Sequence, residues 1–198
     1  MPVLRLDADD LCLSFVNTRY WRGTATPTDE LGVVTDLLVW LARAAPSAAS
    51  LADGWAAAWA ADPGRAARAH ATALDLREML QATLALVAAG QGASVAALNA
   101  ALARAPARAA LACDGVAGWA VGEPGSVEAL LAPVLWSAAD LLAGPRRARL
   151  RVCANPQCGW LFLDDSKSGT RRWCAMSACG NRAKARRHYQ RARAAKPS

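Results

Sequence analysis

Four of the chain's six cysteines form two close pairs in its C-terminal quarter. Four residues separate Cys153 from Cys158, four separate Cys174 from Cys179, and fifteen lie between the pairs. Two such pairs joined by a loop of this size are typical of a tetrahedral zinc site, in which each pair supplies two thiolates. The 46 residues of 151–196 hold too little apolar surface to fold alone, whereas zinc binding contributes on the order of 10–16 kcal/mol at neutral pH. The spacing predicts a small module held together by one structural Zn²⁺.

Two disulfides are the alternative to zinc. The first ten residues carry three aspartates and neither a basic start nor an apolar run, so we expect no secretory signal and a cytoplasmic location, where thiols stay reduced. Four thiolates complete a tetrahedral shell, which favours a structural metal over a catalytic one. The His-x-Glu element of zinc deaminases is absent, although His188 remains open as a replacement ligand. Cys12 and Cys113 are predicted to be ordinary buried thiols.

Charge divides the chain into two parts. Residues 146–198 contain fourteen Lys and Arg against two acids, whereas residues 1–145 contain nine against fourteen. The net charges are therefore +12 and −5. We predict an N-terminal domain over 1–145, with a regulatory, dimerising or ligand-sensing role, and a basic zinc module over 146–198. The sequence leaves the oligomeric state open, a homodimer included.

Apolar spacing indicates that the N-terminal domain is almost wholly helical. The predicted helices lie within 7–19, 28–45, 47–61, 65–89, 94–104 and 123–143. The exception is the segment from Ala109 to Val121, where Asp114–Gly115 divides two short apolar runs and predicts a β-hairpin. The longest uncharged stretch, 79–103, is interrupted by polar residues and glycines, so we expect no membrane span. The predicted fold class is α+β and predominantly helical.

A strongly basic helix is predicted to end the zinc module, running from Ala178 to about Ala194 with Ser177 as its N-cap. Its charges lie almost all round, so like charges repel and the helix has little to pack on. An anionic partner would relieve both problems, and DNA fits because a major groove accepts a helix. A solvated, frayed tail is the alternative. The predicted nucleic-acid contacts are Arg171, Arg172, Arg182, Lys184, Arg186, Arg187, Arg191 and Arg193.

Short segments of the module resemble a known family. The stretches CANPQC (153–158), FLD (162–164), WC (173–174) and CGNRAKARR (179–187) are similar to the CGNR zinc-finger family over the final 46 residues. LCLSFVNTR (11–19) and LWSAADLL (135–142) resemble the stress-induced transcription regulator domain, of ABATE type, that usually precedes that finger. The resemblance implies a bacterial transcription regulator whose four cysteines bind zinc and whose finger binds DNA.

Particular roles follow as hypotheses. Gly180 would avoid crowding the metal, Asn181 would cap the second cysteine loop, and Arg182 would reach a phosphate or brace the site. Trp160 and Trp173 are expected to pack over the zinc centre, with base stacking as the alternative.

Two further functions stay open beside DNA binding. One is an RNA-binding or ribosome-associated zinc protein, which the basic helix permits equally. The other is a ligand pocket in the N-terminal domain, formed by Asn17, Arg19, Tyr20 and Trp21; packing of this segment on the β-hairpin is the simpler alternative. No nucleophile, paired-carboxylate or phosphate-loop pattern is present, so we expect no enzymatic activity.

Overall fold

The computed structural model describes residues 3–4, 10–44, 49–108, 111–114, 116–120 and 125–194. Its α-helices are α1 (Leu11–Val16), α2 (Val34–Ala44), α3 (Ala49–Ala61), α4 (Pro63–Ala88), α5 (Ala96–Arg104), α6 (Val127–Leu130), α7 (Ala132–Ala143) and α8 (Asn181–Ala194). Its strands are β1 (Val3–Leu4), β2 (Arg19–Tyr20), β3 (Thr28–Asp29), β4 (Leu111–Asp114), β5 (Val116–Ala120), β6 (Leu150–Val152) and β7 (Leu161–Leu163). The predicted α+β, predominantly helical class is confirmed.

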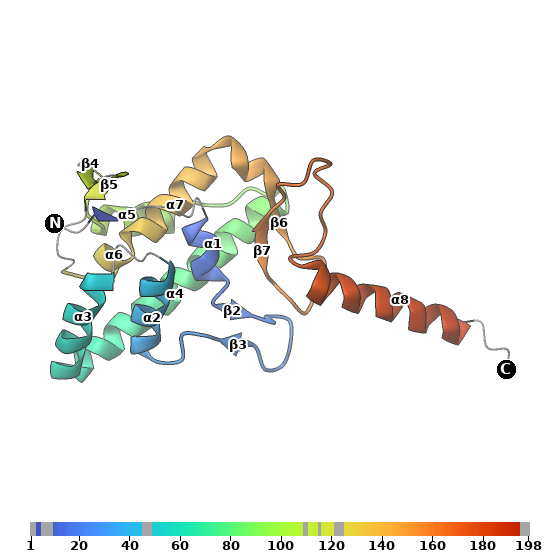
Figure 1. The fold of residues 1–198 in the computed structure, drawn as a ribbon, viewed down its shortest axis with the longest axis horizontal. Helices are drawn as coiled ribbons and strands as arrows, with labels where there is room; N and C mark the ends of the chain where they lie inside the picture. The colour runs from blue at the N-terminus through green and yellow to red at the C-terminus, as the bar shows by residue number, and fades with distance from the viewer. Residues whose placement is uncertain are drawn as a thin grey trace.

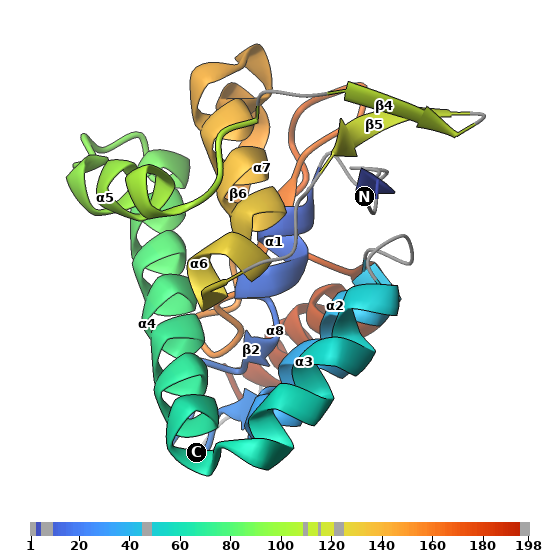
Figure 2. The ribbon, with the colours of Figure 1, turned by 90° about the vertical axis from the view of Figure 1, so that its left-hand side faces the viewer.

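The long helix α4 runs through the body of the molecule, and α1, α2, α3, α5 and α6 pack against it (Figures 1 and 2). Its start is set by Asp62, whose carboxylate accepts a hydrogen bond of 2.8 Å from the backbone N–H of Arg65, and by Pro63 at the first helical position. Leu76, Leu80 and Leu84, four residues apart, form part of its buried face. The capping and the spacing both follow directly from the sequence.

The short helix α1 lies at the centre of the core, between α4 and α7. Phe15 is fully buried, and its ring lies 5.0 Å from that of Trp40 on α2. Cys12 is also fully buried, and its backbone N–H donates to Ser137 on α7. Burial raises the pKa of the Cys12 thiol to about 11, so this thiol stays protonated and unreactive. The predicted buried thiol is confirmed for Cys12, whereas the side chain of Cys113 lies outside the part that the structure describes.

Two predicted helices differ from the structure. The helix expected over 28–45 begins only at Val34, because Thr28–Asp29 instead pair as β3 with β2. The helix expected over 123–143 is divided at Leu131 into α6 and α7. Pro133 at the start of α7 has no N–H to donate back to the preceding turn, so one continuous helix is disfavoured there.

The predicted hairpin is present as β4 and β5, which pair antiparallel. Strand β1 adds to its edge, so the three-stranded sheet has the order β1-β5-β4. Among the described helices, none combines the length and the apolar character that crossing a lipid bilayer requires.

An ion pair between a buried arginine and a partly exposed aspartate fixes the β2–β3 ribbon to α4. The guanidinium of Arg77, only 1% exposed, binds both carboxylate oxygens of Asp29 at 2.6 Å and donates to the hydroxyl of Thr18. Burial raises the pKa of Asp29, but hydrogen bonds from Arg77 and from the Leu31 backbone outweigh it, so the net shift is downward from 3.8. The pair thus contributes stability above that pH, and the contribution is lost as the pH falls through the lowered pKa.

The β6–β7 hairpin belongs to the same core as the N-terminal helices. Leu150 and Leu161 are fully buried, Leu163 is nearly so, and all three join the main apolar cluster. Strand β6 also contacts α4. Because the packing is continuous here, the structure shows no break in the core at the division expected between 1–145 and 146–198. That division stays a prediction.

We expect Arg77→Met to lower the free energy of unfolding by about 2 kcal/mol, because it removes two hydrogen bonds between charged groups, those from Arg77 to the partly exposed Asp29 carboxylate. Urea denaturation followed by circular dichroism measures the loss. The control is Arg43→Met, which breaks the Arg43–Glu30 pair, whose arginine side chain is 66% exposed, and should cost less than about 1 kcal/mol. Equal losses of unfolding free energy in the two variants would contradict the role assigned to the Arg77–Asp29 pair.

Candidate zinc centre and nucleic-acid interface

The four paired cysteines converge from the β6–β7 connection, the loop after β7 and the turn that starts α8. Cys153 directly follows β6, and Cys158 directly precedes the turn into β7. The backbone N–H of Cys158 donates to the carbonyl of Asn155, and that of Cys153 donates to Trp160, which closes the first loop. Cys179 lies in a single π-helical turn, η3 (Met176–Gly180), that leads directly into α8.

The distances between the sulfur atoms fit a tetrahedral zinc ion. All four Sγ atoms lie within 4.8 Å of one another, with Cys158 to Cys174 at 3.7 Å and Cys174 to Cys179 at 3.8 Å. A tetrahedron with Zn–S bonds of about 2.3 Å has edges of about 3.8 Å. A disulfide requires about 2.05 Å, so the alternative of two disulfides does not fit. The chain has one structural zinc site made of four cysteines.

The protein environment shifts the pKa values of these thiols in different directions. Burial, reinforced by the neighbouring sulfurs, raises the pKa of Cys158 and raises that of Cys174 to about 12. Burial also raises the pKa of Cys179, but a hydrogen bond of 3.6 Å from the amide of Asn155 and contacts with the other cysteines turn its net shift downward. Zinc binds thiolates, so metal uptake at neutral pH displaces protons, above all from Cys158 and Cys174.

Asn155 is a functional residue that the sequence analysis did not single out. It is 5% exposed, its amide donates to Cys179, and its side-chain oxygen accepts from the backbone of Gln157. It therefore both shapes the first cysteine loop and supports a metal ligand of the second pair, a supporting role typical of groups around zinc sites. The Asn155–Pro156 dipeptide marks a turn in the sequence, but the contact to Cys179 has no local pattern.

The segment after α1 binds the zinc module through backbone contacts. The side chain of Asn17 accepts from the N–H of Leu161 at 3.0 Å and donates to its carbonyl at 2.8 Å. The N–H groups of Arg22 and Gly23 donate to the carbonyls of Cys158 and Gln157, both at 3.3 Å. A side chain at Gly23 would not fit, because a Cβ there would lie 2.1 Å from the carbonyl oxygen of Pro156.

The four residues predicted to form a ligand pocket lie in or beside this contact. Asn17 is buried against β7, and Tyr20 packs its ring 6.0 Å from that of Trp160. A guanidinium nitrogen of Arg19 lies 3.7 Å from a carboxylate oxygen of Glu78 on α4. The simpler alternative, packing on the β4–β5 hairpin, is wrong for Asn17 and Tyr20, because they pack on the zinc module instead. A ligand-binding role for the four stays a prediction.

Trp21 has positive φ (56°) and packs beside the zinc centre, where Arg182 of α8 stacks on its ring at 4.3 Å. This contact fits the bracing role expected for Arg182, and its contact with a phosphate stays a prediction. Trp160 and Trp173 also pack against the cysteine cluster, as expected. The zinc centre is thus enclosed by aromatic rings from both parts of the chain.

The structure describes the predicted nucleic-acid contacts to different extents. Arg171 is engaged within the module: it stacks on Phe162 at 4.5 Å and donates to the backbone carbonyls of Trp173 and Cys174. Lys184 is exposed on α8. The guanidinium of Arg172 lies 5.5 Å from the ring centroid of Trp173, and Arg182 and Arg186 line a pocket beside it. For Arg187, Arg191 and Arg193 the structure describes the helical backbone alone. Their contact with nucleic acid stays a prediction.

The start of the basic helix differs from the expected one. Ser177 does not cap it; this residue lies inside the π-helical turn η3, and α8 begins at Asn181. The side-chain amide of Asn181 donates to the carbonyl of Ser177 at 3.4 Å, and its expected capping role stays a prediction. A Cβ at Gly180 would meet the Sδ atom of Met176 at 2.6 Å, and the expected crowding of the metal by a side chain there stays a prediction.

A helical domain fused to a four-cysteine zinc centre and a projecting basic helix defines a zinc-finger protein. A family model described as "Putative stress-induced transcription regulator", ABATE, matches residues 9–145, and one described as "CGNR zinc finger" matches residues 149–192. The chain belongs to the ABATE family, whose model covers more than half of it, and carries a CGNR zinc finger after that domain. A comparison with curated proteins gave no match.

We expect the purified protein to contain one zinc ion per chain, measured by elemental analysis. Cys174→Ser should reduce the zinc content well below one, because three sulfurs and a hydroxyl do not complete the thiolate shell. Cys12→Ala is the matched control, since this cysteine is buried away from the cluster and should leave the zinc content at one. A metal-free wild-type protein with an ordered C-terminal region would contradict the assignment.

We expect Asn17→Ala to destabilise the protein by about 2–4 kcal/mol, because the buried N–H and carbonyl of Leu161 both lose their partner. Urea denaturation of the zinc-loaded protein measures the effect. Asn99→Ala, at an exposed position on α5, should change stability by less than about 0.5 kcal/mol. Equal, small losses of stability in the two variants would contradict the prediction, because they would mean that the contact of Asn17 with the zinc module adds nothing to stability.

Proposed function

We propose that this protein is a DNA-binding transcription regulator of bacterial type, in which α8 and the adjoining zinc module contact the DNA. The proposal goes beyond family membership, which supplies the description of a transcription regulator and a zinc finger but not the mode of binding. The observation that carries it is the position of α8. This helix extends away from the rest of the molecule along its longest axis (Figure 1).

The size and charge of α8 suit a nucleic-acid duplex. Its 14 residues correspond to a rod about 21 Å long, and they include six Lys and Arg and no acid. B-DNA has a major groove about 12 Å wide, which admits one helix. Lys184 and Arg186 are exposed, so their charges are available to phosphates.

Polyanion binding also explains why such a helix would be retained. Neighbouring cations on α8 repel one another, and phosphate contacts replace this repulsion with attraction while releasing counterions. The zinc centre sets the direction of the helix, since Cys179 lies in the turn that leads into it. The metal thus acts as an anchor for the binding helix and not as a reaction centre.

The helical domain is assigned the regulatory part of this function. Its contacts with the zinc module through Asn17, Arg22 and Gly23 would couple a change in the domain, caused by a ligand or by dimerisation, to the orientation of α8. We expect a role in a stress response, in keeping with the description of the family. We also expect a cytoplasmic location and no enzymatic activity.

Binding to duplex DNA should weaken steeply with salt. We expect a slope of log K against log[salt] near −4 to −5, which corresponds to about four to six phosphate contacts at about −0.9 each. Lys184→Gln should reduce the magnitude of the slope by about 0.9. Arg43→Gln, which removes an exposed charge on α2 far in sequence from the module, should leave the slope unchanged. Fluorescence anisotropy at several salt concentrations measures all three.

A salt-insensitive complex, or equal effects of the two variants, would contradict the proposal. Competition with structured RNA of the same length separates the alternatives. If RNA displaces the duplex at much lower concentration than unlabelled DNA does, the RNA-binding alternative replaces the DNA-binding one.

A further inference from the structure

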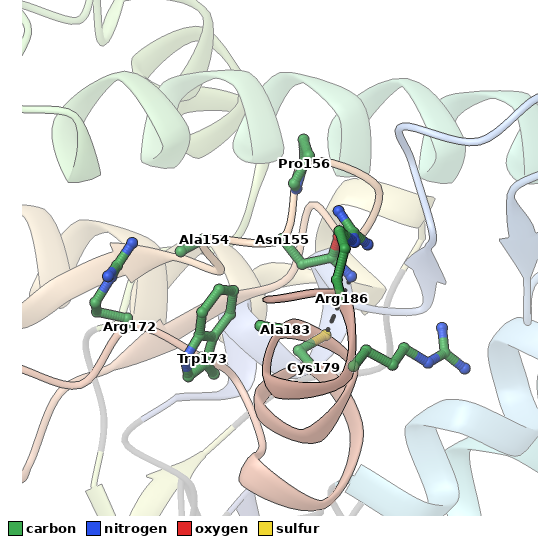
Figure 3. Close-up of a pocket in the computed structure, with 9 residues that line it drawn as sticks. Ala154, Asn155, Pro156, Arg172, Trp173, Cys179, Ala183 and Arg186 are labelled. Carbon is green, nitrogen blue, oxygen red and sulfur yellow. Dashed lines mark hydrogen bonds between the residues drawn. The ribbon is translucent and has the colours of Figure 1, made fainter. Parts of the chain in front are cut away.

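A pocket of about 210 Å³ lies beside the zinc centre, between the first cysteine loop and the first turns of α8. Figure 3 shows Trp173 and Ala183 side by side within it, with Arg172 on one side and Arg186 on the other. Pockets that hold drug-sized ligands have volumes of roughly 300–1,000 Å³. This pocket is therefore large enough only for a compact group, such as one ring system.

One part of the pocket wall is apolar and includes a flat aromatic face. Ala154, Pro156 and Ala183 present small apolar surfaces beside the indole of Trp173. A surface of this kind binds a planar ring by stacking and excludes water from its faces. A simple inorganic anion would gain nothing from these residues, so they point to a ligand with a ring.

The other part of the wall is cationic. Arg172, Arg182 and Arg186 all line the pocket, and none of its described lining residues carries a carboxylate. Arg172 lies over the ring of Trp173 and Arg182 over that of Trp21, which restrains each guanidinium and leaves its N–H edge available. Guanidinium groups held in this way bind phosphate with little further loss of side-chain freedom.

The charge of the zinc centre does not cancel this attraction. Zinc with four thiolates carries a formal charge of −2, whereas the three guanidiniums carry +3. The nearest thiolate, that of Cys179, is 1% exposed and accepts a hydrogen bond from Asn155, which spreads its charge into the protein. The pocket thus combines a stacking surface with a surplus of positive charge.

We propose that this pocket binds a single unpaired nucleotide, with the base stacked on Trp173 and the phosphate held by the arginines. The inference rests on the nucleic-acid-binding function proposed above and specifies which part of the nucleic acid the zinc module recognises. Helix α8 provides contacts along the duplex backbone, and the pocket receives one base that has left the stack.

The test compares two labelled 20-base-pair duplexes, one fully paired and one with a single unpaired adenosine in the middle. We expect the wild-type protein to bind the second duplex about tenfold more tightly, within the range that stacking of one base on an aromatic residue provides. Ala183→Leu fills the pocket without changing any charge. This variant should lose the preference and retain its affinity for the paired duplex within about twofold.

The chain offers a matched control for each variant. Ala185→Leu makes the same substitution at an exposed position of α8 outside the pocket, and it should keep the preference. Arg172→Gln removes an exposed pocket cation and should reduce the preference. Lys184→Gln removes a cation outside the pocket and should weaken binding to both duplexes equally. Zinc content and circular dichroism of each variant verify the fold.

Competition with AMP identifies the source of the nucleotide. If AMP displaces the duplex with the unpaired adenosine from wild-type protein but not from Ala183→Leu, the pocket also binds a free nucleotide. A preference for the unpaired duplex without AMP competition supports a nucleotide within a chain. Equal binding of both duplexes by wild-type protein, together with no effect of AMP, overturns the inference and leaves DNA binding by α8 intact.

If neither duplex binds at all, the proposed function fails. Direct titration of AMP then decides separately on the pocket. Wild-type binding that Ala183→Leu abolishes supports the pocket as a nucleotide site, and no binding of AMP overturns it.

Discussion

The structure depends on four sulfur atoms that have to lie at the corners of one tetrahedron. This requirement brings together two loops that are fifteen residues apart, and it places the last ligand in the turn that starts α8. The basic helix lacks an apolar face of its own, so its position is determined at its first turn. Metal coordination therefore determines where positive charge is presented. The same region has few other means of folding, since most of its buried leucines face the helical domain.

Backbone groups take part in the contact between the helical domain and the zinc centre, beside the packed side chains. Asn17 pairs with both polar groups of Leu161, and Gly23 allows the main chains to approach closely. Such contacts tolerate little displacement, because each leaves a buried polar group without a partner when it opens. If the proposed function holds, a change at the end of α1 would reach the first cysteine loop through this short connection.

Much of the fold could be predicted because its determinants are local. The cysteine spacing, the Asp62–Pro63 helix start and the four-residue spacing of leucines on α4 all lie within short windows of sequence. The contacts that define the site are different: Asn17 and Leu161 are 144 residues apart, and Arg77 and Asp29 are 48 apart. No periodicity or turn pattern reports such a pairing. The expected N-cap at Ser177 failed for a related reason, because this residue lies in a π-helical turn that sequence patterns do not distinguish from an α-helix.

The sharing of one apolar core by β6, β7 and the N-terminal helices limits how this finger can be rearranged. Many zinc fingers fold as independent units that can be joined in a new order, because each has its own core. Here Leu150, Leu161 and Leu163 would be stripped of their cover if the finger were cut out near residue 146. Beyond Asn181, α8 extends from the body as a separate element (Figure 1). Helix α8 can therefore be exchanged without uncovering this core, whereas the metal loops cannot be separated from it.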